Sequence, residues 1–209
     1  MTTKIRKFTL SIGLFGLLLG CLIVTPGSPV NAASPQQLVG DFHQALLETM
    51  KDAKKLGFAG RYKKLAPAIE ATFHLRLMIQ VASGSFWREA DETQRQRLTE
   101  TFSKLSISTY ASRFNGFSGQ SFETLGEKAG PQKTTLVATR IVNPDGKNAD
   151  LTYVAKLVKN QWQIVDVLLD AGISELAVRR SEYRRILKDR GIDGLISILN
   201  AKSAAMAAD

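Results

Sequence analysis

The stretch "TLVATRIVNPDGKNADLTYVAKLVKNQWQIVDVLL", residues 135–169, decides the fold class. Apolar residues alternate with their neighbours on both sides of residues 143–146, and this period of two is typical of strands with one buried face. Asn-Pro-Asp-Gly at 143–146 favours a tight turn, and Lys159-Asn160 predicts a second one. With a further strand near residues 122–125, we expect a four-stranded antiparallel meander.

Helical patterns lie on both sides of this strand region. Ser34-Pro35 combines an N-cap with proline at the first helical position, and apolar residues at three- and four-residue spacing predict a helix that ends near Gly57. Asp91 and Gln94 form a capping box that predicts the start of a second long helix. The remaining helices are expected over residues 61–73, 75–82, 174–188 and 194–199.

These elements predict an α+β fold, in which several helices pack on one face of a curved four-stranded antiparallel sheet. Such an arrangement often leaves an apolar cavity between the sheet and the helices. Residues 33–209 are enough to bury a core as a single domain. The alanine-rich tail, residues 201–209, is expected to fray.

Residues 1–32 have the layout of a secretory signal peptide. Three basic residues precede an apolar run at 8–24, and small residues at 30–32 predict cleavage near Ala32. An uncleaved membrane anchor is a weaker alternative, because the apolar run is only just long enough to span a bilayer. A lipoprotein is another, since residues 18–21, Leu-Leu-Gly-Cys, resemble a lipidation box ending at Cys21, although Leu19 fits it poorly.

Removal of this segment lowers the net charge from +9 to +6 and takes away the single cysteine. The exported protein would therefore fold without a disulfide. Its positive charge favours transient contact with a membrane surface of anionic headgroups, or with an acidic partner, and we expect no nucleic acid. The alternative is that many of these lysines and arginines only keep the protein soluble.

No motif in the sequence predicts a catalytic or metal site. His43 and His74 are far apart, no His or Cys pair has metal-ligand spacing, and we find no nucleophile elbow or phosphate-binding loop. We expect both histidines to be structural. The sequence therefore predicts a protein without metal, cofactor or catalytic residues, and a binding module rather than an enzyme.

Asp166 is the exception, because it interrupts an apolar strand and a buried carboxylate needs a partner. We expect it to pair with Arg179 or Arg180, or to face solvent. Under the alternative that the protein is a small isomerase or hydrolase, Asp166 and Tyr153 would be the acid/base pair. A structural adaptor without a ligand is a third possibility.

The final stretch, "LLDAGISELAVRRSEYRRILKDRGIDGLISIL" at 168–199, resembles the C-terminal signature of the MlaC / toluene-tolerance family of periplasmic lipid-binding proteins. The features that match are Trp162, Asp166, Gly172-Ile173-Ser174, Tyr183 and residues 191–195. "RYKKLAPAIEATF" at 61–73 and "YASRFNGFSGQSF" at 110–122 look closest to the branch associated with hopanoid biosynthesis, HpnM.

The resemblance implies a periplasmic carrier that holds acyl chains or a hopanoid in an internal apolar pocket. It implies exchange of phospholipid or hopanoid with an MCE-type ABC transporter complex of the inner membrane, or with an outer-membrane complex. We expect the aromatic residues of 110–122 to form one wall of the pocket, with core packing as the alternative for each. The predicted ligand-binding residues, of which only one face of each strand can be correct, are Phe102, Tyr110, Phe114, Leu136, Ala138, Tyr153, Leu157, Val165, Val167 and Ile173.

Overall fold

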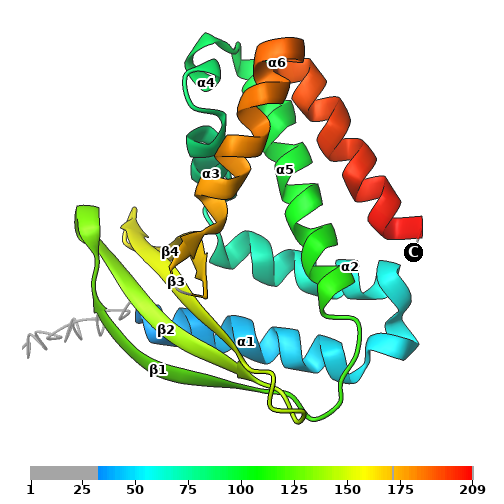
Figure 1. The fold of residues 1–209 in the computed structure, drawn as a ribbon, viewed down its shortest axis with the longest axis vertical. Helices are drawn as coiled ribbons and strands as arrows, with labels where there is room; N and C mark the ends of the chain where they lie inside the picture. The colour runs from blue at the N-terminus through cyan, green and yellow to red at the C-terminus, as the bar shows by residue number, and fades with distance from the viewer. Residues whose placement is uncertain (1–32, 171, 209) are drawn as a thin grey trace, which may run out of the picture. The chain divides into compact units, whose positions relative to one another are not determined.

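The computed structural model describes residues 33–170 and 172–208 (Figure 1). The elements in chain order are α1 (Pro35–Lys51), α2 (Ala53–Thr72), α3 (Leu75–Ser83), α4 (Phe86–Glu89), α5 (Glu92–Arg113), β1 (Ser121–Ala129), the 3₁₀ turn η1 (Pro131–Lys133), β2 (Thr134–Val142), β3 (Ala149–Val158), β4 (Gln161–Leu169), β5 (Ile173–Ser174) and α6 (Glu175–Ala208). The predicted cleavage near Ala32 and the alternative at Cys21 lie outside the described residues. Over the described ranges, no helix combines the length and apolar character needed to cross a bilayer.

The predicted α+β fold is confirmed. The strands lie in the order β1-β2-β3-β4-β5, each antiparallel to its neighbours, so the four-stranded meander gains a two-residue fifth strand at its edge. The register shifts at Leu125 in β1 and at Val165 in β4. Such bulges bend a strand, and Figure 1 shows β1 and β2 curving along their length.

One face of the sheet is covered by helices. Helix α1 contacts β1, β2 and β4, and helices α2, α3 and α6 contact β4. The side chains of Val137, Tyr153 and Ile164 are fully buried on this side. Helix α5 packs against α2, α3 and α6 (Figure 1).

Two glycines break the helices where the sequence predicted helix ends. Helix α1 stops at Lys51, earlier than predicted, because Asp52 leaves helical geometry (φ −95°, ψ 4°). The expected end at Gly57 is instead a kink inside α2 (φ 60°), and Gly191 breaks α6 in the same way (φ 62°). Glycine adopts positive φ at little cost, so both kinks change the helix direction without steric strain.

The C-terminal tail is helical to Ala208, whereas the sequence predicted fraying. Ser203 is only 2% exposed, and its hydroxyl donates a hydrogen bond to the Leu199 carbonyl (3.0 Å). Met206 packs against the core, with its sulfur 3.9 Å from the hydroxyl of Thr109 on α5. Alanine is the best helix former, and these tertiary contacts with α5 keep the last turns ordered.

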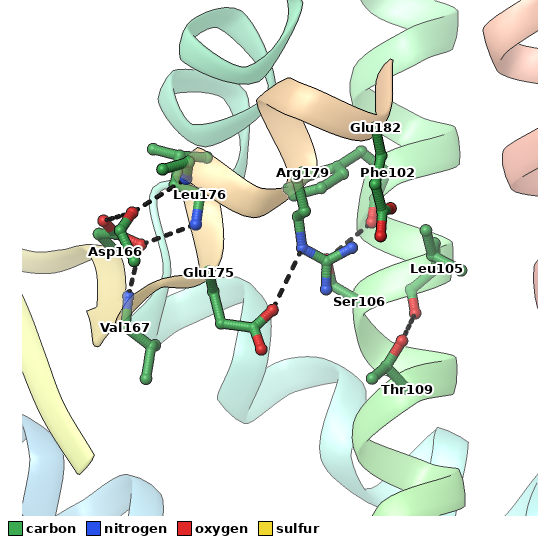
Figure 2. Close-up of polar contacts among 12 residues, drawn as sticks. Phe102, Leu105, Ser106, Thr109, Asp166, Val167, Glu175, Leu176, Arg179 and Glu182 are labelled. Carbon is green, nitrogen blue, oxygen red and sulfur yellow. Dashed lines mark hydrogen bonds and ion pairs between the residues drawn. The ribbon is translucent and has the colours of Figure 1, made fainter. Parts of the chain in front are cut away.

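Asp166 joins the sheet to the last helix (Figure 2). Its Oδ2 accepts a hydrogen bond from the Ser174 hydroxyl (2.6 Å), and its Oδ1 accepts one from the Leu176 N–H (3.1 Å). Ser174 in turn accepts from the Ala177 N–H (2.9 Å) and caps the helix. The carboxylate therefore satisfies orphan donors at the positive end of α6.

This geometry corrects the expected partners of Asp166. Neither Arg179 nor Arg180 bonds to it in the described residues, and the side chain is partly buried rather than on the solvent face. The signal for the observed arrangement was present in the sequence, because Ser174 precedes an acidic residue at the start of a predicted helix. The sequence did not show that Asp166 in the strand contacts Ser174 at the helix cap, eight residues further along the chain.

We expect Asp166→Ala to lower the free energy of unfolding by about 1–3 kcal/mol, because the Ser174 hydroxyl and the Leu176 N–H both lose their acceptor. Urea denaturation followed by circular dichroism measures this change. Asp170→Ala, at an exposed position just after β4, is the matched control and should stay within about 0.5 kcal/mol of the wild type. Equal stabilities for the two variants would contradict a structural role for the Asp166 carboxylate.

Candidate functional site

A cavity of about 210 Å³ lies between the helix-covered face of the sheet and helices α2, α3, α5 and α6, and one side is open. Its wall is mostly apolar. The strands contribute Ile141, Leu151, Tyr153, Val167 and Leu169, and the helices and the α2–α3 junction contribute Ile69, Phe73, Leu75, Met78, Phe102 and Phe114. The predicted apolar cavity between sheet and helices is therefore present.

Strand register explains the apolar wall. Leu151 lies opposite Leu169, and Tyr153 lies opposite Val167, so both pairs project from the same face of the sheet. Ile141 of β2 adds to this face. The period-two pattern of the sequence thus becomes a continuous apolar surface across three strands.

The aromatic stretch 110–122 serves as both core and cavity wall. Tyr110 and Phe114 line the cavity and stack with ring centroids 5.7 Å apart. Tyr110 also meets Phe42 edge-on, with centroids 5.3 Å apart, which ties the wall to helix α1. Phe122 packs on the ring of His43, whereas Phe117 is exposed beneath the ammonium of Lys51. The rings of Tyr110, Phe114 and Phe122 therefore pack together at the corner where α5 gives way to the sheet.

The structure brings half of the predicted ligand-binding residues together at the cavity. These residues are Phe102, Tyr110, Phe114, Tyr153 and Val167. They come from helix α5 with its C-cap and from the neighbouring strands β3 and β4, which are distant from α5 in the sequence. Their contact with a ligand remains a prediction.

The other five predicted residues lie outside the cavity wall, each for a geometric reason. Leu136 and Ala138 point to the opposite face of β2, because alternate side chains of a strand face opposite ways. Val165 is the unpaired residue of the β4 bulge. Leu157 lies on the correct face of β3 but near the end of the strand, where it is 47% exposed. Ile173, in the edge strand β5, is 57% exposed.

The cavity residues of α2, α3 and the strand ends were not predicted from the sequence. Leu151 and Leu169 could have been found by extending the alternation of Tyr153 and Val167 by two positions. Phe73 could have been found as the apolar residue that ends a predicted helix. No sequence pattern predicted the charged residues of the cavity wall, which are Arg113, Glu175 and Arg179.

Arg179 is the most deeply buried charge of the cavity (Figure 2). Its side chain is 20% exposed, and its guanidinium lies over the ring of Phe102, 5.6 Å from the centroid. The Nε atom is 3.8 Å from Oε2 of Glu175, and Nη1 is 3.4 Å from the hydroxyl of Tyr183. Both distances are long for hydrogen bonds.

The tentative acid/base pair of Tyr153 and Asp166 does not form within the described residues. The Tyr153 hydroxyl bonds to Nε2 of His43 (3.0 Å), and burial raises its pKa well above the usual range. Asp166 is bonded to Ser174 and Leu176 instead. Across the same ranges, no three His, Cys, Asp or Glu side chains gather as a metal site would require.

A curved sheet that is covered on one face by helices around an apolar cavity defines a binding domain for an apolar ligand. The family model described as MlaC protein matches residues 41–201. The chain therefore belongs to the MlaC family. The lipid-binding transport proteins of this family are not enzymes, in agreement with the prediction of a binding module.

Two individual proteins show the relationship in more detail. The intermembrane phospholipid transport system binding protein MlaC of Haemophilus influenzae is 27% identical over 118 residues, which cover 54% of this chain and 55% of the relative. The match thus spans about half the length of that relative. A solved structure of a phospholipid-binding protein from Ralstonia solanacearum, in complex with a phospholipid, matches with a TM-score of 0.72 and 22% identity, over 84% of this chain and 99% of that chain. This likeness shows a shared fold.

His43 gives the site a pH-dependent stability. Its ring is buried between Tyr153 and Phe122, and this burial lowers its pKa from 6.5 to about 4. The unfolded chain therefore binds a proton before the folded protein does, and stability is lost as the pH falls from 6.5 towards 4.

We expect acidification from pH 7 to pH 4.5 to remove about 2 kcal/mol more from the wild type than from His43→Gln. The difference in stability loss between the two proteins reports on His43 alone, because both proteins carry the same carboxylates. Urea unfolding at the two pH values measures it. An identical pH dependence in the two proteins would show that the pKa of His43 is the same in the folded and unfolded states, which would contradict the lowered pKa.

Proposed function

We propose that this protein is a periplasmic lipid carrier that holds the acyl chains of a phospholipid in the cavity and shuttles the lipid between membrane complexes. The observation that carries the proposal is an apolar, open-sided cavity in a chain of the MlaC family. Two findings on relatives support a phospholipid as cargo. The Haemophilus influenzae relative is named as the binding protein of an intermembrane phospholipid transport system, and the Ralstonia solanacearum structure holds a phospholipid.

The energetics suit a carrier that hands its lipid over directly. Burial of one CH₂ group is worth roughly 0.8 kcal/mol, so a chain of about 16 carbons contributes on the order of 12 kcal/mol. A lipid held in this way escapes into water very slowly. Release then requires a partner that receives the chain, and we propose an MCE-type ABC transporter complex of the inner membrane or an outer-membrane complex. The +6 charge of residues 33–209 favours transient contact with anionic membrane surfaces.

The cavity must widen to take a lipid. Its volume of about 210 Å³ is below the 300–1,000 Å³ usual for ligand pockets. Met78 lines it, and its unbranched side chain adapts to irregular space. The open side lets the rest of a long ligand extend outwards. We therefore expect acyl chains to enter through this side and the side chain of Met78 to rearrange around them.

A hopanoid is the second candidate cargo. The two segments that resemble the HpnM branch, residues 61–73 and 110–122, both contribute to the cavity wall, through Ile69 and Phe73 in one and Tyr110 and Phe114 in the other. Three of these four side chains are aromatic, which suits a rigid apolar ring system as well as an acyl chain. The hopanoid assignment stays a prediction that rests on these residues.

Filling the cavity tests the proposal. Ser106 lies on the cavity-facing side of α5, so Ser106→Phe would occupy space needed by the lipid while keeping the wall apolar. We expect the rate of phospholipid transfer between donor and acceptor vesicles to fall at least about tenfold, because chain burial supplies most of the binding free energy. Fluorescence dequenching of a labelled phospholipid measures the rate.

Ser181→Phe, on an exposed part of α6, is the matched control and should transfer lipid like the wild type. Circular dichroism and thermal unfolding establish that both variants are folded. Undiminished transfer by a folded Ser106→Phe protein would place the lipid outside this cavity.

A further inference from the structure

Arg179 is an unusual residue for the wall of an apolar cavity. Its side chain is largely buried, and Figure 2 shows it directed from α6 towards α5, between Glu175 and Phe102. A buried guanidinium is stable only when its charge is paired and its donors are bonded. The position of Arg179 therefore needs an explanation beyond packing.

Its partners within the described residues satisfy the guanidinium incompletely. The group carries five N–H donors, and its single hydrogen bond, to the Tyr183 hydroxyl, is long at 3.4 Å. The Glu175 carboxylate, at 3.8 Å, is close enough for charge attraction but too distant for a hydrogen bond. The face of the group rests on Phe102. Several donors of this cavity-lining group thus have no hydrogen-bond partner among the described residues.

The neutral polar groups of the cavity are mostly occupied. The Ser106 hydroxyl donates to the Phe102 carbonyl, and the Thr109 hydroxyl donates to the Leu105 carbonyl, both at 2.8 Å. The Tyr153 hydroxyl bonds to His43. A ligand that enters the cavity therefore meets the charged side chains of the wall, Arg179 among them, as its main polar contacts.

The charges of the wall also favour an anion. They are Arg113, at the C-terminal end of α5, Arg179 and Glu175, which together leave one net positive charge. A phosphodiester carries one negative charge. Its oxygens match the planar fork of a guanidinium, which binds phosphate through two parallel hydrogen bonds.

We propose that Arg179 binds the phosphate group of the carried lipid, and that Glu175 is the weak counter-ion that the phosphate replaces. The inference rests on the proposed lipid carriage and adds a polar end to the site. Phosphate binding at Arg179 orients the lipid, with the chains along the apolar wall. It also makes the carrier discriminate between lipids with and without a phosphate.

The test uses the exported protein, produced from the full chain and stripped of lipid. Binding of phosphatidylglycerol and of diacylglycerol with the same acyl chains is measured by displacement of a fluorescent lipid. We expect the wild type to bind the phospholipid at least about tenfold more tightly, as a charge-assisted bond requires. Arg179→Gln should lose this preference and keep its affinity for diacylglycerol. Glu175→Gln should bind the phospholipid at least as tightly as the wild type.

Arg180→Gln is the matched control, because this neighbouring arginine is exposed and lies outside the cavity wall. It should keep the full preference. Arg179→Lys, which keeps the charge but loses the paired hydrogen bonds, should show a reduced preference, and it serves as the test if Arg179→Gln does not fold. Thermal unfolding checks each variant.

The outcomes separate the two proposals. If folded Arg179→Gln and Arg179→Lys proteins keep the preference for phosphatidylglycerol, the role of Arg179 is overturned while lipid carriage stands. If the wild type binds neither lipid, lipid carriage itself fails. Inorganic phosphate brings no apolar chain and should compete weakly. Displacement of the phospholipid by millimolar inorganic phosphate would overturn the proposal by making Arg179 a site for the free ion.

Discussion

The hydrogen bonds between Asp166 and the first turn of α6 are the constraint on which the site depends. They fix the start of this helix against strand β4, through Ser174 and the N–H of Leu176. The same turn carries Glu175, and the next carries Arg179, so one carboxylate in the sheet helps to determine where these two charged residues of the cavity lie. An acidic residue that the sequence offered as a catalytic candidate thus acts as a structural anchor.

The cavity combines two kinds of recognition. Under the proposed function, apolar side chains of three strands and the facing helices would retain an acyl chain, since its burial is favourable in proportion to its area. Under the proposed role of Arg179, its guanidinium would orient the lipid by binding the phosphate at one part of a mostly apolar wall. Under the proposed function, retention of this strength would make spontaneous release slow. Such a carrier would need a partner for unloading.

The local patterns of the sequence predicted most of the fold. Period-two alternation found the strands and placed Tyr153 and Val167 on the wall, and the capping box predicted the start of α5. Long-range geometry was out of reach. The bulge at Val165 depends on how neighbouring strands are paired, and so does the face of the sheet on which the Leu136 side chain lies. The sequence of one strand alone does not determine this pairing. The alanine-rich tail stays helical because it packs against α5. The burial of Arg179 depends on how α6 packs against Phe102 of α5.

The central claim is that the cavity holds one lipid molecule. Native mass spectrometry of the exported protein, followed by organic extraction and lipid analysis, tests it most directly. The account predicts a one-to-one adduct whose extracted mass is that of a phospholipid, or of a hopanoid if the second cargo is correct. A protein that carries no adduct after gentle purification, and takes up none from phospholipid or hopanoid vesicles, would contradict it.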